Sequence, residues 1–172
     1  MNSNIIFKAK FFAKNGKKDH DYYQQGKYIS YVTRKNILPI FDLNGKILET
    51  SQINDQIKKR KSFFWDTIFS FRNEFVQNLD FLDGKVVAEI LKHPLEKFFQ
   101  ANWLDPKKMN VFFAIHNDKN NHYDVHVAFF KNEPNFLKTN KKTKKVEFGF
   151  RNKGNLAGLD FINFKELKRG IF

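Results

Sequence analysis

The pattern of hydrophobic and polar positions predicts β-strands along several stretches of the chain. Residues 4–13 alternate apolar with polar or small side chains, and residues 63–71 are rich in aromatic and β-branched residues without a strand breaker. Two apolar runs at 109–115 and 125–130 flank a polar centre at 117–121 whose composition is typical of a turn. We therefore expect a first strand, a central strand and a hairpin with a five-residue turn.

Apolar residues recur at helical spacing elsewhere, and this periodicity predicts helices. The predicted helices cover residues 21–35, 51–61, 72–80, 84–101 and 156–169. The first of them places Tyr28, Tyr31 and Val32 at helical spacing. Pro94 is expected to kink or split the helix of residues 84–101, because proline removes a helical hydrogen bond.

Turn and loop residues separate these elements. Asn44-Gly45 predicts a small hairpin or loop within residues 41–49. Residues 131–147 are polar and lysine-rich, which predicts a basic loop. The chain shows no internal repeat and no domain linker. The sum is one α+β domain over residues 1–172, an antiparallel β-sheet with helices packed on it.

Composition excludes several classes of protein. The hydrophobic fraction of 41% and the 22 phenylalanines predict a packed core. The absence of cysteine excludes a disulfide scaffold, a thiol nucleophile and a Cys-ligated zinc site. No signal-peptide pattern is visible, and no apolar run reaches the roughly 18 residues that a membrane span needs. We therefore expect a cytoplasmic protein without membrane insertion.

Charge indicates the kind of partner. Lysine and arginine total 31 against 18 acidic residues, which gives a formal net charge of +13. Such an excess favours a polyanion, and first of all a nucleic acid. The competing interpretation is a solubilising surface.

The polar centre of the hairpin concentrates candidate metal ligands. Because successive side chains of a strand point to opposite faces, His122, Asp124 and His126 share one face, and His116 ends the incoming strand. Two triads are possible: His116, His122 and Asp124, or His116, Asp124 and His126. Imidazole and carboxylate groups bind divalent metals, and Asp118 is expected to support a ligand or the turn. The alternative is a polar surface beside a turn.

Tyrosine is the candidate nucleophile of a chain that lacks cysteine. A metal with open coordination positions polarises a phosphodiester, and a tyrosine hydroxyl can then attack the phosphorus. Tyr22, Tyr23, Tyr28 and Tyr31 cluster within ten residues. The alternative is that these rings are helix-face aromatics packed on the sheet.

Three sequence blocks, in order and approximate spacing from about residue 5 to residue 136, form a further pattern. They are YISYVTR at 28–34, WDTIFSF with NEF at 65–71 and 73–75, and AIH, DVHVA and EPN at 114–116, 124–128 and 133–135. Together they resemble the HUH relaxases, the nickases of conjugative elements, and among these the MobL-type mobilisation proteins. The first block is similar to the family's Tyr-x-x-Tyr-x-x-Arg.

One position departs from the family's pattern, which has a histidine followed by a His-hydrophobic-His pair. Asp124-Val125-His126 carries an aspartate in place of the first paired histidine. In this register the resemblance implies His116, Asp124 and His126 as metal ligands. In the other register His122 and Asp124 take the paired positions. In either case a carboxylate replaces one imidazole, which shifts the preference toward Mn or Mg.

The resemblance implies a metal-dependent, site-specific nickase that cuts and rejoins single-stranded DNA at an origin of transfer and so initiates the transfer of a plasmid or conjugative element. Tyr31 or Tyr28 would attack the phosphodiester and remain attached to the 5′ phosphate, with a divalent Mn or Mg ion as cofactor. Arg34 would contact phosphate or hold the site together. The chain would then be a fragment of a longer relaxase or a compact version of one.

The implied partners are single-stranded DNA and the accessory and coupling proteins of conjugation, with no small-molecule substrate. Basic residues and exposed aromatics would track the DNA by charge and stacking. The basic residues expected to do so are Lys58, Lys59, Arg60, Lys61, Lys141, Lys142, Lys144 and Lys145.

Two other functions remain open. A rolling-circle replication initiator of the same HUH class would share the sheet, the metal and the tyrosine. A non-catalytic, basic nucleic-acid-binding protein with a degraded metal site would explain both Asp124 and the short chain.

Overall fold

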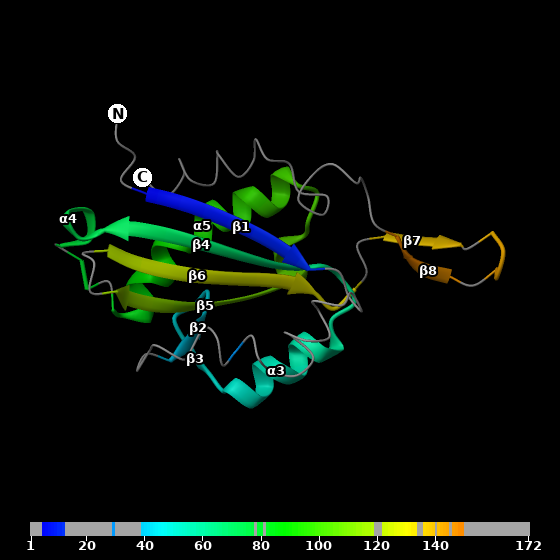
Figure 1. Cartoon of the computed structure of the whole chain (residues 1–172), viewed down its shortest axis with the longest axis horizontal. Coiled ribbons are helices and arrows are strands. Elements are labelled where there is room, and N and C mark those ends of the chain that lie inside the picture. Colours follow the sequence, from blue (N-terminus) through cyan, green and yellow to red (C-terminus); the bar gives the residue numbers. More distant parts are fainter. Residues whose placement is uncertain are drawn as a thin grey trace.

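A six-stranded antiparallel sheet forms the centre of the molecule, and helices pack on its two faces (Figure 1). The computed structural model describes residues 5–12, 29, 39–77, 79–80, 82–118, 122–133, 136–139, 141–144 and 146–149. Its elements are β1 (Ile5–Phe12), β2 (Ile40–Asp42), β3 (Ile47–Leu48), α3 (Thr50–Lys59), β4 (Phe64–Arg72), α4 (Asn73–Val76), α5 (Gly84–Ala101), η2 (Pro106–Lys108), β5 (Met109–Asp118), β6 (His122–Lys131), β7 (Phe136–Thr139) and β8 (Val146–Gly149). The α+β class is as the sequence predicts.

The strand order of the large sheet is β1-β4-β6-β5-β2-β3. The strands expected at residues 4–13 and 63–71 are present as β1 and β4, and β4 lies inside the sheet between β1 and β6. The hairpin expected at residues 109–130 is present as β5 and β6. Its strands continue further than predicted, because Asn117 and Asp118 pair with Tyr123 and His122 instead of forming part of a turn.

The predicted helices agree with the structure to different degrees. α5 begins and ends at the predicted residues, and Pro94 does not split it. α3 matches the predicted basic helix within two residues at its end, whereas α4 covers only four of the residues 72–80. The helices predicted at 21–35 and 156–169 lie outside the described residues, except for Ile29.

The basic loop predicted at residues 131–147 is wrong, because β7 and β8 pair as an antiparallel two-stranded sheet. Phe136 and Leu137 precede the lysine-rich centre, and Val146 and Phe148 follow it. Residues with high β-propensity therefore flank the charged stretch, and their strand pairing outweighs the lysine content of the segment.

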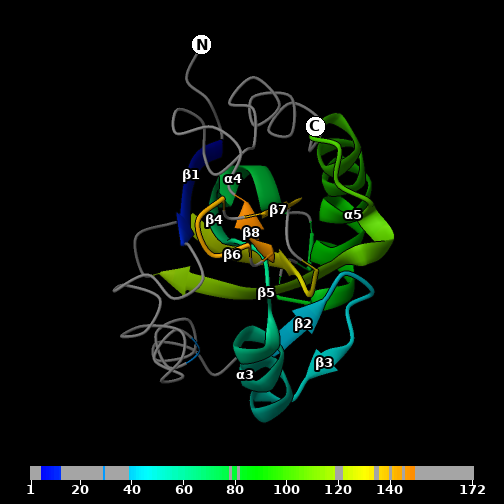
Figure 2. The same ribbon diagram turned by 90° about the vertical axis from the view of Figure 1, so that its right-hand side faces the viewer.

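Each face of the large sheet buries its own hydrophobic cluster. The face toward α5 carries Trp65, Phe69, Val125, Val127 and Phe129 with residues of α5. The opposite face buries the smaller cluster of Ile29, Ile40, Ile53, Ile57, Phe64, Phe112, Ala114, Ala128 and Phe130, to which α3 contributes. Figure 2 shows α5 and α3 on opposite sides of β5 and β6. Since strand side chains alternate, even-numbered residues of β6 face the α3 side.

The β2–β3 hairpin confirms the prediction from Asn44-Gly45. Gly45 adopts a φ of +73°, which glycine tolerates without a Cβ penalty. The Asp42 Oδ1 accepts hydrogen bonds from the backbone N–H groups of Asn44 (2.8 Å) and Lys46 (3.0 Å) and so closes the turn. Within the described part of the chain, no helix has the length and apolar character that crossing a membrane requires.

Candidate functional site

The pairing of β5 with β6 brings the predicted ligands onto one face of the sheet. His116 lies directly opposite Asp124, and His126 lies directly opposite Ala114. Directly opposed residues of an antiparallel pair project from the same face. The predicted common orientation of His122, Asp124 and His126 is therefore confirmed, and His116 joins them on the α3 side of the sheet.

Two of the three histidines on this face, His116 and His126, are in contact. The imidazole rings of His116 and His126 have centroids 4.3 Å apart and planes inclined by 36°. His126 is 6% exposed, whereas His116 is half-buried. Ala114 opposite His126 and Ala128 two residues beyond it are both small and buried, so they leave space for the rings beside the apolar cluster. The imidazoles thus lie at the border between the buried cluster and solvent.

Asp124 carries the carboxylate of this group. Its Oδ1 lies 3.7 Å from the Nε2 of His122, which is longer than a hydrogen bond. This oxygen is buried and accepts no hydrogen bond from the residues that the structure describes. A buried polar atom without a hydrogen bond costs about 1–3 kcal/mol, so a cation or a donor at this position would stabilise the site.

The donor atoms are of the types that bind metal ions, but the described side chains are not arranged around a common point. Within the described ranges, no three or more histidine and acidic side chains are arranged so that they hold a metal ion. The residues fit a divalent ion by type and by register, because His116, Asp124 and His126 share one face at adjacent ladder positions.

Other predicted site residues lie partly or wholly outside the described residues. Tyr28, Tyr31 and Arg34 are outside them, and only the backbone of Asp118 is described, opposite His122. Ile29 follows Tyr28 directly and is 1% exposed. It belongs to the same buried cluster as Ala114 and Ala128, so this position of the tyrosine-bearing segment packs on the histidine face.

The predicted DNA-tracking residues divide into exposed and buried groups. The side chains of Lys58, Lys59, Lys61, Lys141, Lys142 and Lys144 are exposed, and Lys145 lies outside the described residues. Arg60 is fully buried, so its side chain does not lie on the surface predicted for DNA.

Arg60 instead closes the end of α3. Its Nη1 donates a hydrogen bond of 2.9 Å to the carbonyl oxygen of Ile57, and its guanidinium lies 5.6 Å from the centroid of the Phe64 ring. Burial lowers the pKa of Arg60 to about 10. The run of basic residues hid this position, because charge alone does not distinguish a solvated residue from a packed one.

Strand β4 adds polar residues to the histidine face that the sequence analysis did not select. Ser70 lies opposite Asp124, and Arg72 lies opposite His122 and is exposed. Asp66 is 5% exposed and lies opposite Ala128 on the same face. The alternation along residues 64–72 separates these polar residues from Trp65, Phe69 and Phe71, which face the other side of the sheet. The sequence does not show that this strand pairs with β6, and so the polar residues were not connected with the histidines.

A surface cleft lies elsewhere on the molecule. It has a volume of about 290 Å³, and Phe99, Met109, Val111 and Lys107 are among its lining residues. Phe99, Met109 and Val111 belong to the α5 side of the sheet. The histidines therefore lie on the face opposite this cleft.

Comparison of this chain with protein-family models, with curated proteins and with solved structures finds no match. The function of the chain is therefore inferred from its own residues and their geometry.

Proposed function

We propose that this chain is a metal-dependent nickase of single-stranded DNA, of the HUH relaxase type, that acts at an origin of transfer. The observation that supports this best is the paired register of His116 and Asp124, with the His126 ring in contact with His116 on the same sheet face. Two imidazoles and a carboxylate form a donor set for a divalent ion such as Mn or Mg.

The bound metal would neutralise charge on the scissile phosphate and orient it for attack. The buried Asp124 Oδ1 supports this proposal, since a cation would supply the partner that no described hydrogen bond provides. Arg72 is exposed on the neighbouring strand and lies opposite His122, where a guanidinium would bind a flanking phosphate in a bidentate manner.

The nucleophile in this proposal is the hydroxyl of Tyr31 or Tyr28. The oxygen forms a bond to phosphorus, the bond from phosphorus to the 3′ oxygen breaks, and that oxygen leaves as a free 3′ hydroxyl with the tyrosine proton. The reverse step rejoins the strand. Ile29, which lies between the two tyrosines in sequence, is buried in the cluster on the sheet face that carries the histidines, and this supports the proposal.

Charge supports single-stranded DNA as the substrate. The formal net charge is +13, and exposed lysines lie in the last turn of α3 at Lys58 and Lys59 and just beyond it at Lys61. Such a surface attracts phosphates at long range and releases counterions when DNA binds. The accessory and coupling proteins of conjugation are the further partners of this proposal.

A covalent-adduct assay tests the proposal. The chain is incubated with Mn and a random-sequence pool of 3′-labelled single-stranded DNA, because the fragment downstream of the nick keeps both the label and the tyrosine link. We expect a labelled protein band on a denaturing gel, and its loss in either Tyr31→Phe or Tyr28→Phe. Tyr123→Phe is the matched control, since Tyr123 packs against the α5-side core. DNA binding without a labelled band under Mn or Mg would refute the nickase.

The second candidate is a non-catalytic nucleic-acid-binding protein. It is favoured by the side-chain positions of the described histidine and acidic residues, no three of which form a metal-holding group. This candidate predicts DNA binding that metal chelation leaves unchanged and that forms no covalent adduct.

A further inference from the structure

Trp103 occupies an unusual backbone position at the end of α5. The N–H of Leu104 donates to the carbonyl oxygen of Phe99 (2.9 Å), and the N–H of Trp103 donates to that of Gln100 (3.0 Å). These two bonds form a Schellman motif, in which the residue at the Trp103 position is usually glycine because its φ is positive. Trp103 has a φ of 59°, so a bulky L-residue holds a left-handed conformation.

The Trp103 ring gains nothing from burial to offset this conformation. It is 93% exposed, against 57% for Ile47, the next most exposed of the large hydrophobic side chains in the described ranges. The left-handed backbone of an L-residue costs free energy, and a solvated indole contributes no burial energy that would offset it. Strained backbone positions of this kind occur preferentially at functional sites.

The turn fixes the backbone on both sides of the indole. Asn102 and Leu104 are buried, and the Nδ2 of Asn102 donates a hydrogen bond of 2.8 Å to the carbonyl oxygen of Phe98. Leu104 packs in the same core cluster as Phe99. The exposed ring is therefore presented from a rigid backbone, which lowers the entropy cost of binding a partner through it.

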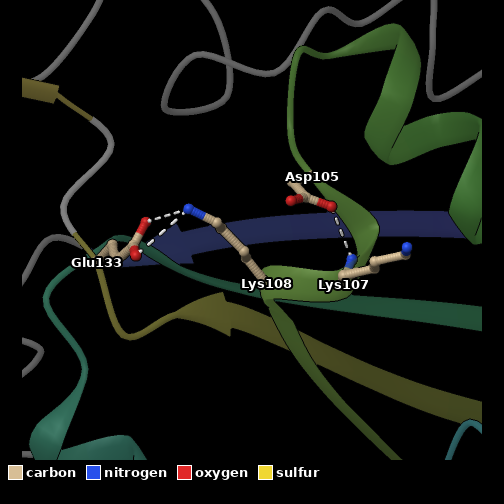
Figure 3. A network of polar contacts seen from close by, with 4 residues as sticks. All are labelled: Asp105, Lys107, Lys108 and Glu133. Atoms are coloured by element: carbon tan, nitrogen blue, oxygen red, sulfur yellow. Dashed lines mark hydrogen bonds and ion pairs between the residues drawn. The ribbon is translucent and has the colours of Figure 1, made fainter.

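The whole chain, more than the residues next to Trp103, favours an anionic partner, because its formal net charge is +13. Between residues 96 and 108 three lysines, Lys97, Lys107 and Lys108, stand against two acidic residues, Glu96 and Asp105. The Lys108 Nζ lies 3.2 Å from Glu133, and Asp105 accepts a hydrogen bond from the backbone N–H of Lys107 (Figure 3). The amino group of Lys107 extends away from both carboxylates in the same view.

We propose that Trp103 and Lys107 form a stacking contact for single-stranded nucleic acid, with a base on the indole and the adjacent phosphate beside Lys107. Aromatic stacking combined with lysine charge is the usual means of holding single strands without reading their sequence. Only the choice of DNA as the ligand rests on the proposed function. The contact lies at the Met109 end of β5, about 23 Å along the strand from His116 at 3.3 Å per residue. It would therefore hold a segment of DNA away from the nicked bond.

Tryptophan emission tests this contact, because the chain has two tryptophans and Trp65 is 1% exposed. The full chain is titrated with a single-stranded oligo(dT) in the absence of metal. We expect quenching from Trp103, and a dissociation constant raised between about 5-fold and 150-fold in Trp103→Gly, as loss of one stacked base predicts. Trp103→Gly should unfold at the same or a higher temperature, since glycine relieves the left-handed conformation. An unchanged dissociation constant in Trp103→Gly would overturn the proposal, and so would an emission spectrum of the unchanged protein that oligo(dT) does not alter.

A pair of lysine variants tests the charge component. Lys107→Gln is expected to weaken binding and to lower the salt dependence of the dissociation constant. Lys85→Gln is the matched control, because Lys85 is exposed at the other end of α5, about 24 Å away at 1.5 Å per residue. Equal effects of both variants would refute the local contact, as would self-association of the chain that Trp103→Gly abolishes.

The stacking contact and the nickase proposal can be refuted independently of each other. If the chain binds oligo(dT) through Trp103 but forms no covalent adduct, the stacking contact is supported and the nickase is refuted. If the chain forms the adduct but Trp103→Gly binds oligo(dT) as tightly as the unchanged protein, the nickase is supported and the stacking contact is refuted.

Discussion

The imidazole rings of His116 and His126 lie 4.3 Å apart, although neither residue is the direct ladder partner of the other. His116 faces Asp124, and His126 faces Ala114, so the two rings meet along the diagonal of the β5–β6 pair. The small side chain of Ala114 leaves this space open. The hairpin therefore presents two imidazoles in contact with each other, and the carboxylate-bearing Asp124 lies directly opposite His116.

Metal binding is expected to depend on this group. Mn should raise the unfolding temperature of the unchanged chain, because a ligand that binds the folded state stabilises it. His116→Ala should remove most of this shift, measured by thermal unfolding at increasing Mn. His93→Ala is the control, since His93 is exposed on α5. Equal Mn shifts in both variants would contradict the site.

The same measurement distinguishes the two possible ligand registers. If His126 is a ligand, His126→Ala abolishes the Mn shift and His122→Ala changes it little. We expect this result because the His126 ring is in contact with His116. The opposite result would assign His122 and Asp124 as the paired ligands.

Asp124→His should change which metals bind best. The substitution replaces an oxygen donor with a nitrogen donor, and imidazole favours Zn, Ni and Cu over Mg and Mn. Calorimetric titration is expected to show tighter Ni binding and weaker Mg binding than in the unchanged chain. Asp83→His, at the N-terminus of α5 away from the sheet face, is the control and should leave both affinities unchanged.

Arg60 is expected to stabilise the fold in spite of its buried charge. Arg60→Ala removes the hydrogen bond to Ile57 and the packing on Phe64, and it leaves a cavity. Large-to-small substitutions in a core cost about 2–5 kcal/mol of unfolding free energy. Lys59→Ala at the exposed neighbour should change it by less than about 0.5 kcal/mol. Urea unfolding measures both values, and equal values would contradict the packed role.

Lys131 should make stability depend on pH in the alkaline range. Burial lowers the pKa of Lys131 from its ordinary value of 10.5, the carboxylate of Glu133 opposes part of this shift, and Lys108 adds a smaller lowering. The unfolded chain therefore binds more protons between the folded pKa and 10.5, so this residue's contribution to stability rises with pH through that window. At pH 8 Lys131→Met should unfold at a higher temperature than the unchanged chain, and the difference in unfolding temperature should become smaller toward pH 10.5. A constant difference across that range would contradict the prediction.

The sequence by itself determined much of the framework. Alternation identified β1, the β-rich composition of residues 63–71 identified β4, and two apolar runs around a polar turn identified the β5–β6 pair. The two-residue repeat of a strand placed His122, Asp124 and His126 on one face. Helical periodicity predicted both ends of α5. These features follow from local geometry, since the repeat of 2.0 or 3.6 residues is a property of one segment alone.

Only the tertiary structure decided which segments lie side by side. The pairing of β4 with β6 placed Ser70 and Arg72 beside the histidine face, and the β5–β6 register brought the ring of His116 to that of His126. Long-range packing likewise buried Arg60 within a basic run while leaving Trp103 exposed. A sequence pattern shows which residues of a segment share a face, but strand order, register and depth of burial arise from contacts between segments that are distant in the chain.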